Sequence, residues 1–165
     1  MLGIELLRHE HGPALLAFER ENRGYFAACV PDRGDGYFAE FDARHAGILA
    51  GQAAGQDYFH VLVGADGEVL GRVNLVDVAD GAAELGYRVA EKATGRGVAT
   101  AAVRQVLDLA VSAYGLRTLR AVTTRDNAGS HAVLTRTGFL PTGETFVDDG
   151  HLCVRYALDL VPPRR

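Results

Sequence analysis

Two glycines flank an arginine at the start of an apolar helical pattern, and this arrangement could bind an anion. The residues are Gly95, Arg96 and Gly97, and the helical pattern begins at Gly97. The first N–H groups of a helix lack partners within it, and a glycine lacks the Cβ that would keep a phosphate away. The segment therefore predicts a phosphate-binding loop, although a tight strand-to-helix turn would use the same residues.

The two common nucleotide-binding motifs do not match this loop. A nucleoside triphosphate loop needs Gly-Lys-Ser/Thr, but Val98 and Ala99 follow Gly97. A dinucleotide fingerprint needs a third glycine where this chain has Thr100. Neither class of nucleotide is favoured as the ligand.

The histidines and cysteines do not predict a metal site or a redox site. The six histidines include no H-E-x-x-H motif or comparable ligand spacing. Cys29 and Cys153 lie far apart and form no C-x-x-C pair. We therefore expect no metal, and a reduced, cytoplasmic setting for the protein.

Composition favours one globular domain over residues 1–161, followed by a loose tail at residues 162–165. Apolar residues make up 48% of the 165 residues, and the formal net charge is -4. A nucleic-acid partner is disfavoured, because such binders usually carry a basic surplus. No apolar run approaches the roughly 18 residues of a membrane span, and the start of the chain lacks the pattern of a signal peptide.

Hydrophobic periodicity places the glycine loop between a strand and a helix of a mixed sheet. Strands are predicted at residues 4–8, 58–64, 69–78, 82–89, 118–123 and 152–160, and helices at 13–22, 37–52, 97–114 and 128–137. Asp66-Gly67 and Asp80-Gly81 separate three consecutive strands and are typical of hairpin turns. The order β-α-α-β-β-β-α-β-α-β-β predicts an α/β (α+β) fold with a mixed, mostly antiparallel central sheet and flanking helices.

Two segments resemble the GNAT acetyltransferase superfamily over nearly the whole chain. Thr94-x-x-Gly97-x-Ala99 resembles its coenzyme A pyrophosphate motif, R/Q-x-x-G-x-G/A, but departs from it at Thr94. Residues 127–139 resemble the N-x-x-S-x-x-V-x-x-x-x-G-F helix of the ribosomal-protein alanine/serine acetyltransferases, the RimJ/RimL branch. The resemblance implies an acetyl-CoA-dependent N-acetyltransferase in which the amine attacks directly in a ternary complex, with coenzyme A as product.

The resemblance also implies which residues contact acetyl-CoA. Backbone groups of the strand before the loop would hold the pantetheine arm, as an added strand would, and the loop would hold the diphosphate. The implied residues are Tyr87, Arg88, Val89, Thr94, Gly95, Arg96, Gly97, Val98, Ala99, Thr100, Asn127 and Ser130.

Two side chains are candidates for proton transfer. A protonated amine must lose a proton before it attacks, and Glu84 is the candidate general base, through a water, because similar enzymes carry a carboxylate there. Many members protonate the leaving thiolate with a tyrosine at the position of Leu134, and the RimJ/RimL branch implies Ser130 instead. Structural roles would give the same sequence pattern. Glu84 would then be a solvent-facing residue of an alternating strand, and Ser130 a first-turn serine that satisfies backbone donors.

The acceptor is less well specified than the acetyl donor. The resemblance implies that the first helical pair forms part of the acceptor wall, through Arg23, Tyr25, Phe26, Tyr37 and Phe38, although core packing would also explain most of them. The RimJ/RimL likeness favours a protein N-terminus as acceptor. A small amine, such as a polyamine, amino acid or antibiotic, is the alternative within enzymes, and an acyl-CoA-sensing module is the alternative outside them. Monomer and homodimer both remain open.

Overall fold

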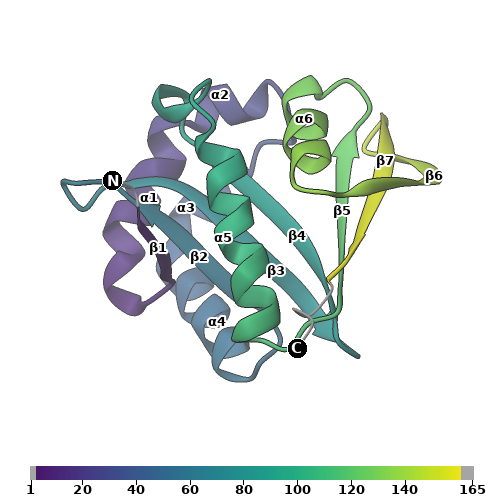
Figure 1. Ribbon diagram of the computed structural model, residues 1–165. Coiled ribbons are helices and arrows are strands. Elements are labelled where there is room, and N and C mark those ends of the chain that lie inside the picture. Colours follow the sequence, from purple (N-terminus) through teal and green to yellow (C-terminus); the bar gives the residue numbers. More distant parts are fainter. Residues whose placement is uncertain (1–2, 161–165) are drawn as a thin grey trace.

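Seven strands form one sheet in the order β1-β2-β3-β4-β5-β7-β6 (Figure 1). The computed structural model describes residues 3–160, so the tail expected at residues 162–165 lies outside the described residues. The strands are β1 (Gly3–Leu6), β2 (Tyr58–Val63), β3 (Val69–Ala79), β4 (Ala82–Val89), β5 (Thr118–Thr124), β6 (Leu140–Asp148) and β7 (His151–Asp159). All neighbours pair antiparallel except β4 and β5, which confirms the predicted mixed, mostly antiparallel sheet.

The predicted meander of three strands is present, and its second turn has the expected geometry. Ala79 pairs with Ala82, so Asp80 and Gly81 form a two-residue loop between β3 and β4. Both loop residues have positive φ, 53° and 77°, as a type I′ turn requires. The right-handed twist of the strands favours this turn, which fixes the register of β4.

The parallel pair of β4 and β5 separates halfway along. Pairing begins at Ala82 with Thr118 and ends at Leu85 with Ala121. Beyond this point β4 stays paired with β3, and β5 stays paired with β7 as far as Thr124. The facing edges of residues 86–89 and 122–124 are therefore free of each other, and Figure 1 shows the two strands diverging.

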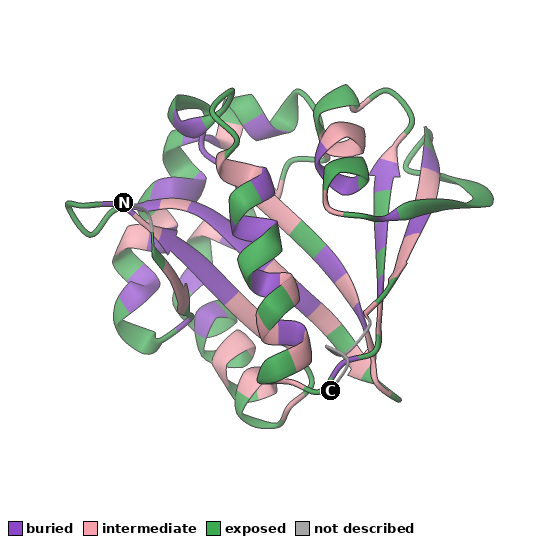
Figure 2. Cartoon of the chain, viewed as in Figure 1, coloured by how far each residue is buried: buried purple, intermediate pink, exposed green. Residues whose placement is uncertain are grey.

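Helices cover both faces of the sheet and enclose two apolar clusters (Figure 2). One face carries α5 (Val98–Ser112) and α6 (Ala128–Arg136). The other carries α1 (Gly12–Glu21), α2 (Arg23–Ala27), α3 (Asp35–Ala39) and α4 (Phe41–Ala53). Short 3₁₀ turns, η1 (His9–His11) and η2 (Glu91–Ala93), precede α1 and the glycine loop.

The prediction of two helices between the first two strands was wrong, because four are present within residues 3–160. Asn22, at φ -102° and ψ 8°, leaves the helical region, so α1 ends there and the five-residue α2 begins; its side chain donates to the Phe18 carbonyl at 2.9 Å. Glu40, at φ -106° and ψ 18°, leaves the helical region and divides the predicted helix at residues 37–52 into α3 and α4. Such short helices contain too few residues for a periodic signal.

The strand β6 is an exposed edge strand, which explains why its bounds had no sequence signal. Every residue from Leu140 to Asp148 is exposed, so apolar and polar residues need not alternate along it. Within residues 3–160, no helix has the length and apolar character needed to cross a membrane.

Candidate functional site

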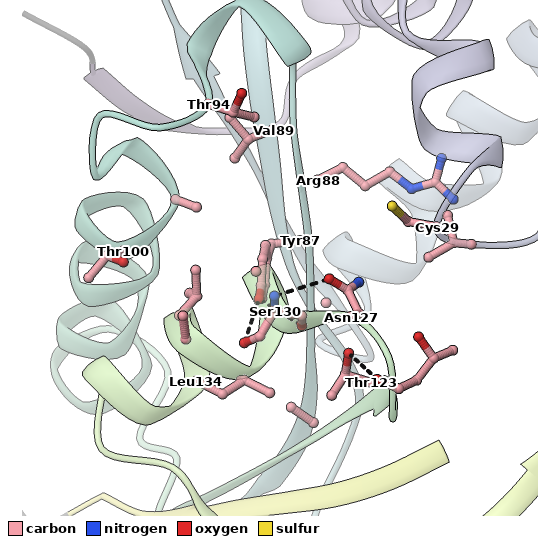
Figure 3. Close-up of a pocket in the computed structure, with 18 of the residues that line it drawn as sticks. Cys29, Tyr87, Arg88, Val89, Thr94, Thr100, Thr123, Asn127, Ser130 and Leu134 are labelled. Carbon is pink, nitrogen blue, oxygen red and sulfur yellow. Dashed lines mark hydrogen bonds between the residues drawn. The ribbon is translucent and has the colours of Figure 1, made fainter. Parts of the chain in front are cut away.

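A cavity of about 650 Å³ occupies the opening between β4 and β5. Its walls come from both strands, from the first turns of α5 and α6, and from α2 with the residues that follow it; Figure 3 shows part of this lining. Of the residues assigned to acetyl-CoA by resemblance, the lining includes Tyr87, Arg88, Val89, Thr94, Gly95, Gly97, Val98, Ala99, Thr100, Asn127 and Ser130.

The glycine loop provides a cradle of backbone donors at the start of α5. Gly97 caps the helix in the left-handed conformation at φ 73°, and Gly95 also has a positive φ of 77°. Apart from the glycine itself and its two chain neighbours, no described residue has an atom within 4 Å of where a Cβ would stand at either position. Ala101 is the first residue of the helix whose N–H is accepted, by the Gly97 carbonyl at 3.0 Å. The earlier N–H groups and the open space fit a diphosphate.

Arg96 lies outside this cradle, unlike the two glycines beside it. Its Nη2 donates to the Lys92 carbonyl at 2.7 Å, and the residue is exposed. Thr94, at the first position of the motif, donates its hydroxyl to the Glu91 carbonyl at 2.7 Å. Backbone groups therefore make up the cradle, while these two side chains brace the loop.

The first turn of α6 brings a second set of polar groups to the cavity. The Asn127 side chain accepts a hydrogen bond from the Ser130 N–H at 3.1 Å, which caps the helix. The Ser130 hydroxyl lies 2.9 Å from the Tyr87 hydroxyl of β4 (Figure 3). Burial raises the pKa of Tyr87, and the Ser130 contact opposes this rise in part. Tyr87 is therefore a neutral phenol near neutral pH, able to donate a proton.

Glu84 stands on β4 where the strand is still paired with β5, and it is absent from the cavity lining described above. Its carboxylate accepts a hydrogen bond from Nη1 of Arg155 at 3.2 Å. Nε of Arg155 also contacts the exposed Glu144 at 2.9 Å. Glu84 and Arg88 are four residues apart on one strand, so their side chains leave the same face of β4.

The five acceptor candidates divide into two groups. Tyr25 and Phe26 line the cavity, together with Cys29. The other three are absent from the described lining. Arg23 donates to Asp32 at 3.0 and 2.8 Å and to Asp35 at 2.8 Å, and it lies 4.6 Å from the centre of the Phe38 ring. Tyr37 is 7% exposed and belongs to an apolar cluster.

A buried carboxylate with three arginines was missed by the sequence analysis. Glu19 is 1% exposed and accepts hydrogen bonds from Arg33 and Arg72 at 3.0 Å and from Arg88 at 3.3 Å. The Arg88 guanidinium also lies 4.9 Å from the centre of the Phe26 ring. The one available signal was that Glu19 falls on the apolar face of the predicted helix at 13–22, where a charge needs a partner.

The far wall of the cavity was also missed. Thr123 and Thr124 at the end of β5, and Cys153 on β7, line it. A second cavity of about 550 Å³ shares Cys29, Thr124 and Asn127 with the first. It lies between the residues that follow α2 and the start of β7, beside the first cavity. No group of three or more His, Cys, Asp or Glu in the described part of the chain could hold a metal ion.

The chain belongs to the family described as acetyltransferase (GNAT) domain, which matches residues 2–140. It is therefore an acyltransferase enzyme of the GNAT type. The chain is 28% identical to the probable N-acetyltransferase YjcK of Bacillus subtilis (strain 168) over 134 residues. These residues cover 78% of this chain and 74% of that protein.

Solved structures of other acetyltransferases confirm the GNAT fold. The ribosomal-protein-S5-alanine acetyltransferase of Vibrio fischeri superimposes with a TM-score of 0.89 at 18% identity, over 96% of this chain and 93% of that one. Mycobacterium smegmatis RimJ, in complex with CoA-disulfide, superimposes with a TM-score of 0.84 at 24% identity, over 96% of this chain and 81% of that one.

Proposed function

We propose that this enzyme transfers an acetyl group from acetyl-CoA to the α-amine of a protein N-terminus, by direct attack in a ternary complex. The observation that carries the proposal is the opening between β4 and β5, which has unpaired helix N–H groups at one end and two apposed hydroxyls at its centre. Acetyl-CoA supplies the activated acetyl thioester.

The chain's own groups would hold the donor in this opening. The N–H groups at the start of α5 would bind the diphosphate, because that end of the helix carries a partial positive charge. The free edge of residues 86–89 on β4 would pair with the amides of the pantetheine arm. A backbone N–H on this edge would stabilise the negative charge that develops on the acetyl oxygen during attack.

Proton transfer is assigned to groups on opposite faces of β4. Glu84 would accept the proton of the amine through a water, since its carboxylate is outside the cavity lining. Ser130 would protonate the departing thiolate sulfur, Tyr87 would return a proton to Ser130 through the 2.9 Å contact, and solvent would then reprotonate Tyr87. The acceptor and the leaving group then lie on separate sides of the strand.

A polymeric acceptor is favoured by the second cavity. This cavity of about 550 Å³ shares Cys29, Thr124 and Asn127 with the first, and it would accommodate the residues that follow the first residue of a peptide. The fold neighbours named as ribosomal-protein acetyltransferases agree with such an acceptor. A polyamine is less suitable, because Arg88 places a positive charge on the acceptor side.

The test is an acceptor panel with acetyl-CoA, in which thiol release is followed and the product is located by mass spectrometry. The panel contains peptides with a free N-terminus, the same peptides with a formylated N-terminus, polyamines and free amino acids. We expect acetylation of the free peptides on the α-amine and none of the formylated ones. A small amine with a higher kcat/KM than every peptide would refute the peptide assignment, and tight binding without transfer would indicate a sensing module.

A further inference from the structure

Three arginines share one buried carboxylate beside the acceptor side of the cavity. Glu19 accepts hydrogen bonds from Arg33 and Arg72 through Oε2 and from Arg88 through Oε1. Arg72 is 4% exposed, and its Nε has no hydrogen-bond partner in the structure. Three guanidinium groups against one carboxylate leave a surplus of two positive charges in this cluster.

Nearby acidic residues do not neutralise the surplus. Asp32 and Asp35 bind Arg23, and Glu21 faces Lys92 at 3.8 Å. Within residues 3–160, no carboxylate other than that of Glu19 lies within 4.0 Å of the three guanidinium groups. An anion from outside the chain would therefore be attracted to this cluster.

Of the three arginines, Arg88 also lines the cavity. Figure 3 shows its side chain leaving β4 in the direction of Cys29, away from α5 and from the Tyr87–Ser130 contact. Its hydrogen bond to Glu19 uses Nη1 alone and is long, at 3.3 Å. Nε and Nη2 have no partner among the described residues, so one edge of the guanidinium group is free to bind a carboxylate through two parallel hydrogen bonds.

We propose that Arg88 binds an acidic side chain of the acceptor peptide close to its N-terminus, so that the acceptor class is acidic N-terminal sequences. The inference rests on the proposed function and narrows its acceptor. The free edge of the guanidinium group, its place in the lining and the uncompensated charge behind it carry the assignment.

The electrostatic state of Arg88 agrees with this role. Burial lowers the pKa of Arg88, and repulsion from Arg33 lowers it further, while Glu19 opposes both effects. A carboxylate from the acceptor would offset the burial and the repulsion together. The same environment disfavours a polycation, which would add positive charge to an existing surplus.

The experiment uses pairs of acceptor peptides that differ in one residue, Asp or Asn, placed in turn at the second, third and fourth positions. The measured quantity is the ratio of kcat/KM for the Asp peptide to that for the Asn peptide. We expect a ratio of about ten or more at one position for the wild-type enzyme, the value typical of a hydrogen bond to a charged group. Arg88→Gln should bring the ratio close to one, and Arg88→Lys should retain part of it because the charge remains.

The matched control is Arg20→Gln, which removes an exposed positive charge from the same helix as Glu19. It should keep the wild-type ratio. Each ratio compares two acceptors on one enzyme sample. A lower concentration of folded enzyme therefore affects both kcat/KM values equally and cancels in the ratio. A wild-type ratio near one at all three positions, or an Arg88→Gln variant that keeps the wild-type ratio, would overturn the proposal.

Two further arms separate this inference from the proposed function. If free amino acids are acetylated in preference to their amides, and Arg88→Gln removes that preference, the carboxylate site stands and the peptide acceptor falls. If no amine is acetylated, calorimetric binding of the Asp and Asn peptides in the presence of coenzyme A still tests whether Arg88 binds the acidic side chain. A preference that depends on Arg88 supports the site, and equal binding overturns it.

Discussion

The hydroxyl oxygens of Tyr87 and Ser130 lie 2.9 Å apart and join β4 to the first turn of α6 across the cavity. The Ser130 N–H donates to the Asn127 side chain, so the serine has a defined position in the first turn of the helix. The two hydroxyls can pass a proton from one to the other, because each is both a donor and an acceptor. This contact is the most direct candidate for a route by which the leaving sulfur is protonated.

Ser130→Ala should lower kcat by about 100-fold, the lower limit for loss of a general acid. The dissociation constant of coenzyme A should change little. Tyr87→Phe should lower kcat less, and the double variant should lose less than the product of the two single losses, because both residues act in one contact. Single-turnover kinetics and calorimetry measure these quantities.

Ser112→Ala is the control for this pair, because Ser112 lies on α5 and donates its hydroxyl to the Asp108 carbonyl. It should retain the wild-type kcat. Wild-type turnover by both Ser130→Ala and Tyr87→Phe would mean that the contact only braces α6 against β4.

Glu84→Gln should lower kcat/KM by about tenfold or more near neutral pH if Glu84 is the general base. The deficit should shrink as pH rises toward the pKa of the amine, since a neutral amine needs no base. The measurement is the pH profile of kcat/KM for one peptide acceptor.

Glu144→Gln is the matched control for Glu84, because both carboxylates contact Arg155 and Glu144 is exposed. It should leave the pH profile unchanged. Equal profiles for the wild-type enzyme and for Glu84→Gln would mean that Glu84 is not the general base and only forms an ion pair with Arg155.

Gly97→Glu should weaken acetyl-CoA binding by about tenfold or more, because the new carboxylate repels the diphosphate and fills the space above the helix terminus. Calorimetry measures the dissociation constant. Gly115→Ala controls for backbone strain, since Gly115 has a similar φ of 62° near the far end of α5. It should cost about 1 kcal/mol of stability and leave acetyl-CoA binding intact. If Gly97→Glu binds acetyl-CoA as tightly as the wild type does, the glycine loop does not bind the diphosphate.

Acid should destabilise the protein through His60. Burial lowers the pKa of His60 below its ordinary value of 6.5, although its contact with the Val73 carbonyl opposes the shift. Between the folded pKa and 6.5, the unfolded state binds more protons than the folded state. The free energy of unfolding should therefore fall as pH falls below 6.5 through this interval.

Urea unfolding at a series of pH values, for the wild type and for His60→Gln, tests this dependence. The variant should lose less stability on acidification than the wild type, because it lacks the titrating group. His151→Gln, at an exposed position, should follow the wild type. Parallel curves for all three proteins would exclude His60 as a source of the acid sensitivity.

Local sequence determined the parts of the site that depend on neighbouring residues. The Asp80-Gly81 turn, the glycine loop at residues 95–97 and the helix that follows were predicted with nearly correct bounds. Turn type depends on which residues tolerate positive φ, and a long amphipathic helix repeats its pattern over several turns. Both signals are complete within a short stretch of chain, so no knowledge of packing is needed.

Tertiary structure decided which side chains meet. Tyr87 and Ser130 are 43 residues apart, Glu19 and Arg88 are 69 apart, and Glu84 and Arg155 are 71 apart. These contacts depend on three features of the packing: β7 lies beside β5 in the sheet, β4 separates from β5 halfway along, and a helix break separates α1 from α2. Local patterns specify an element and its buried face, whereas the distance between two side chains depends on how whole elements pack.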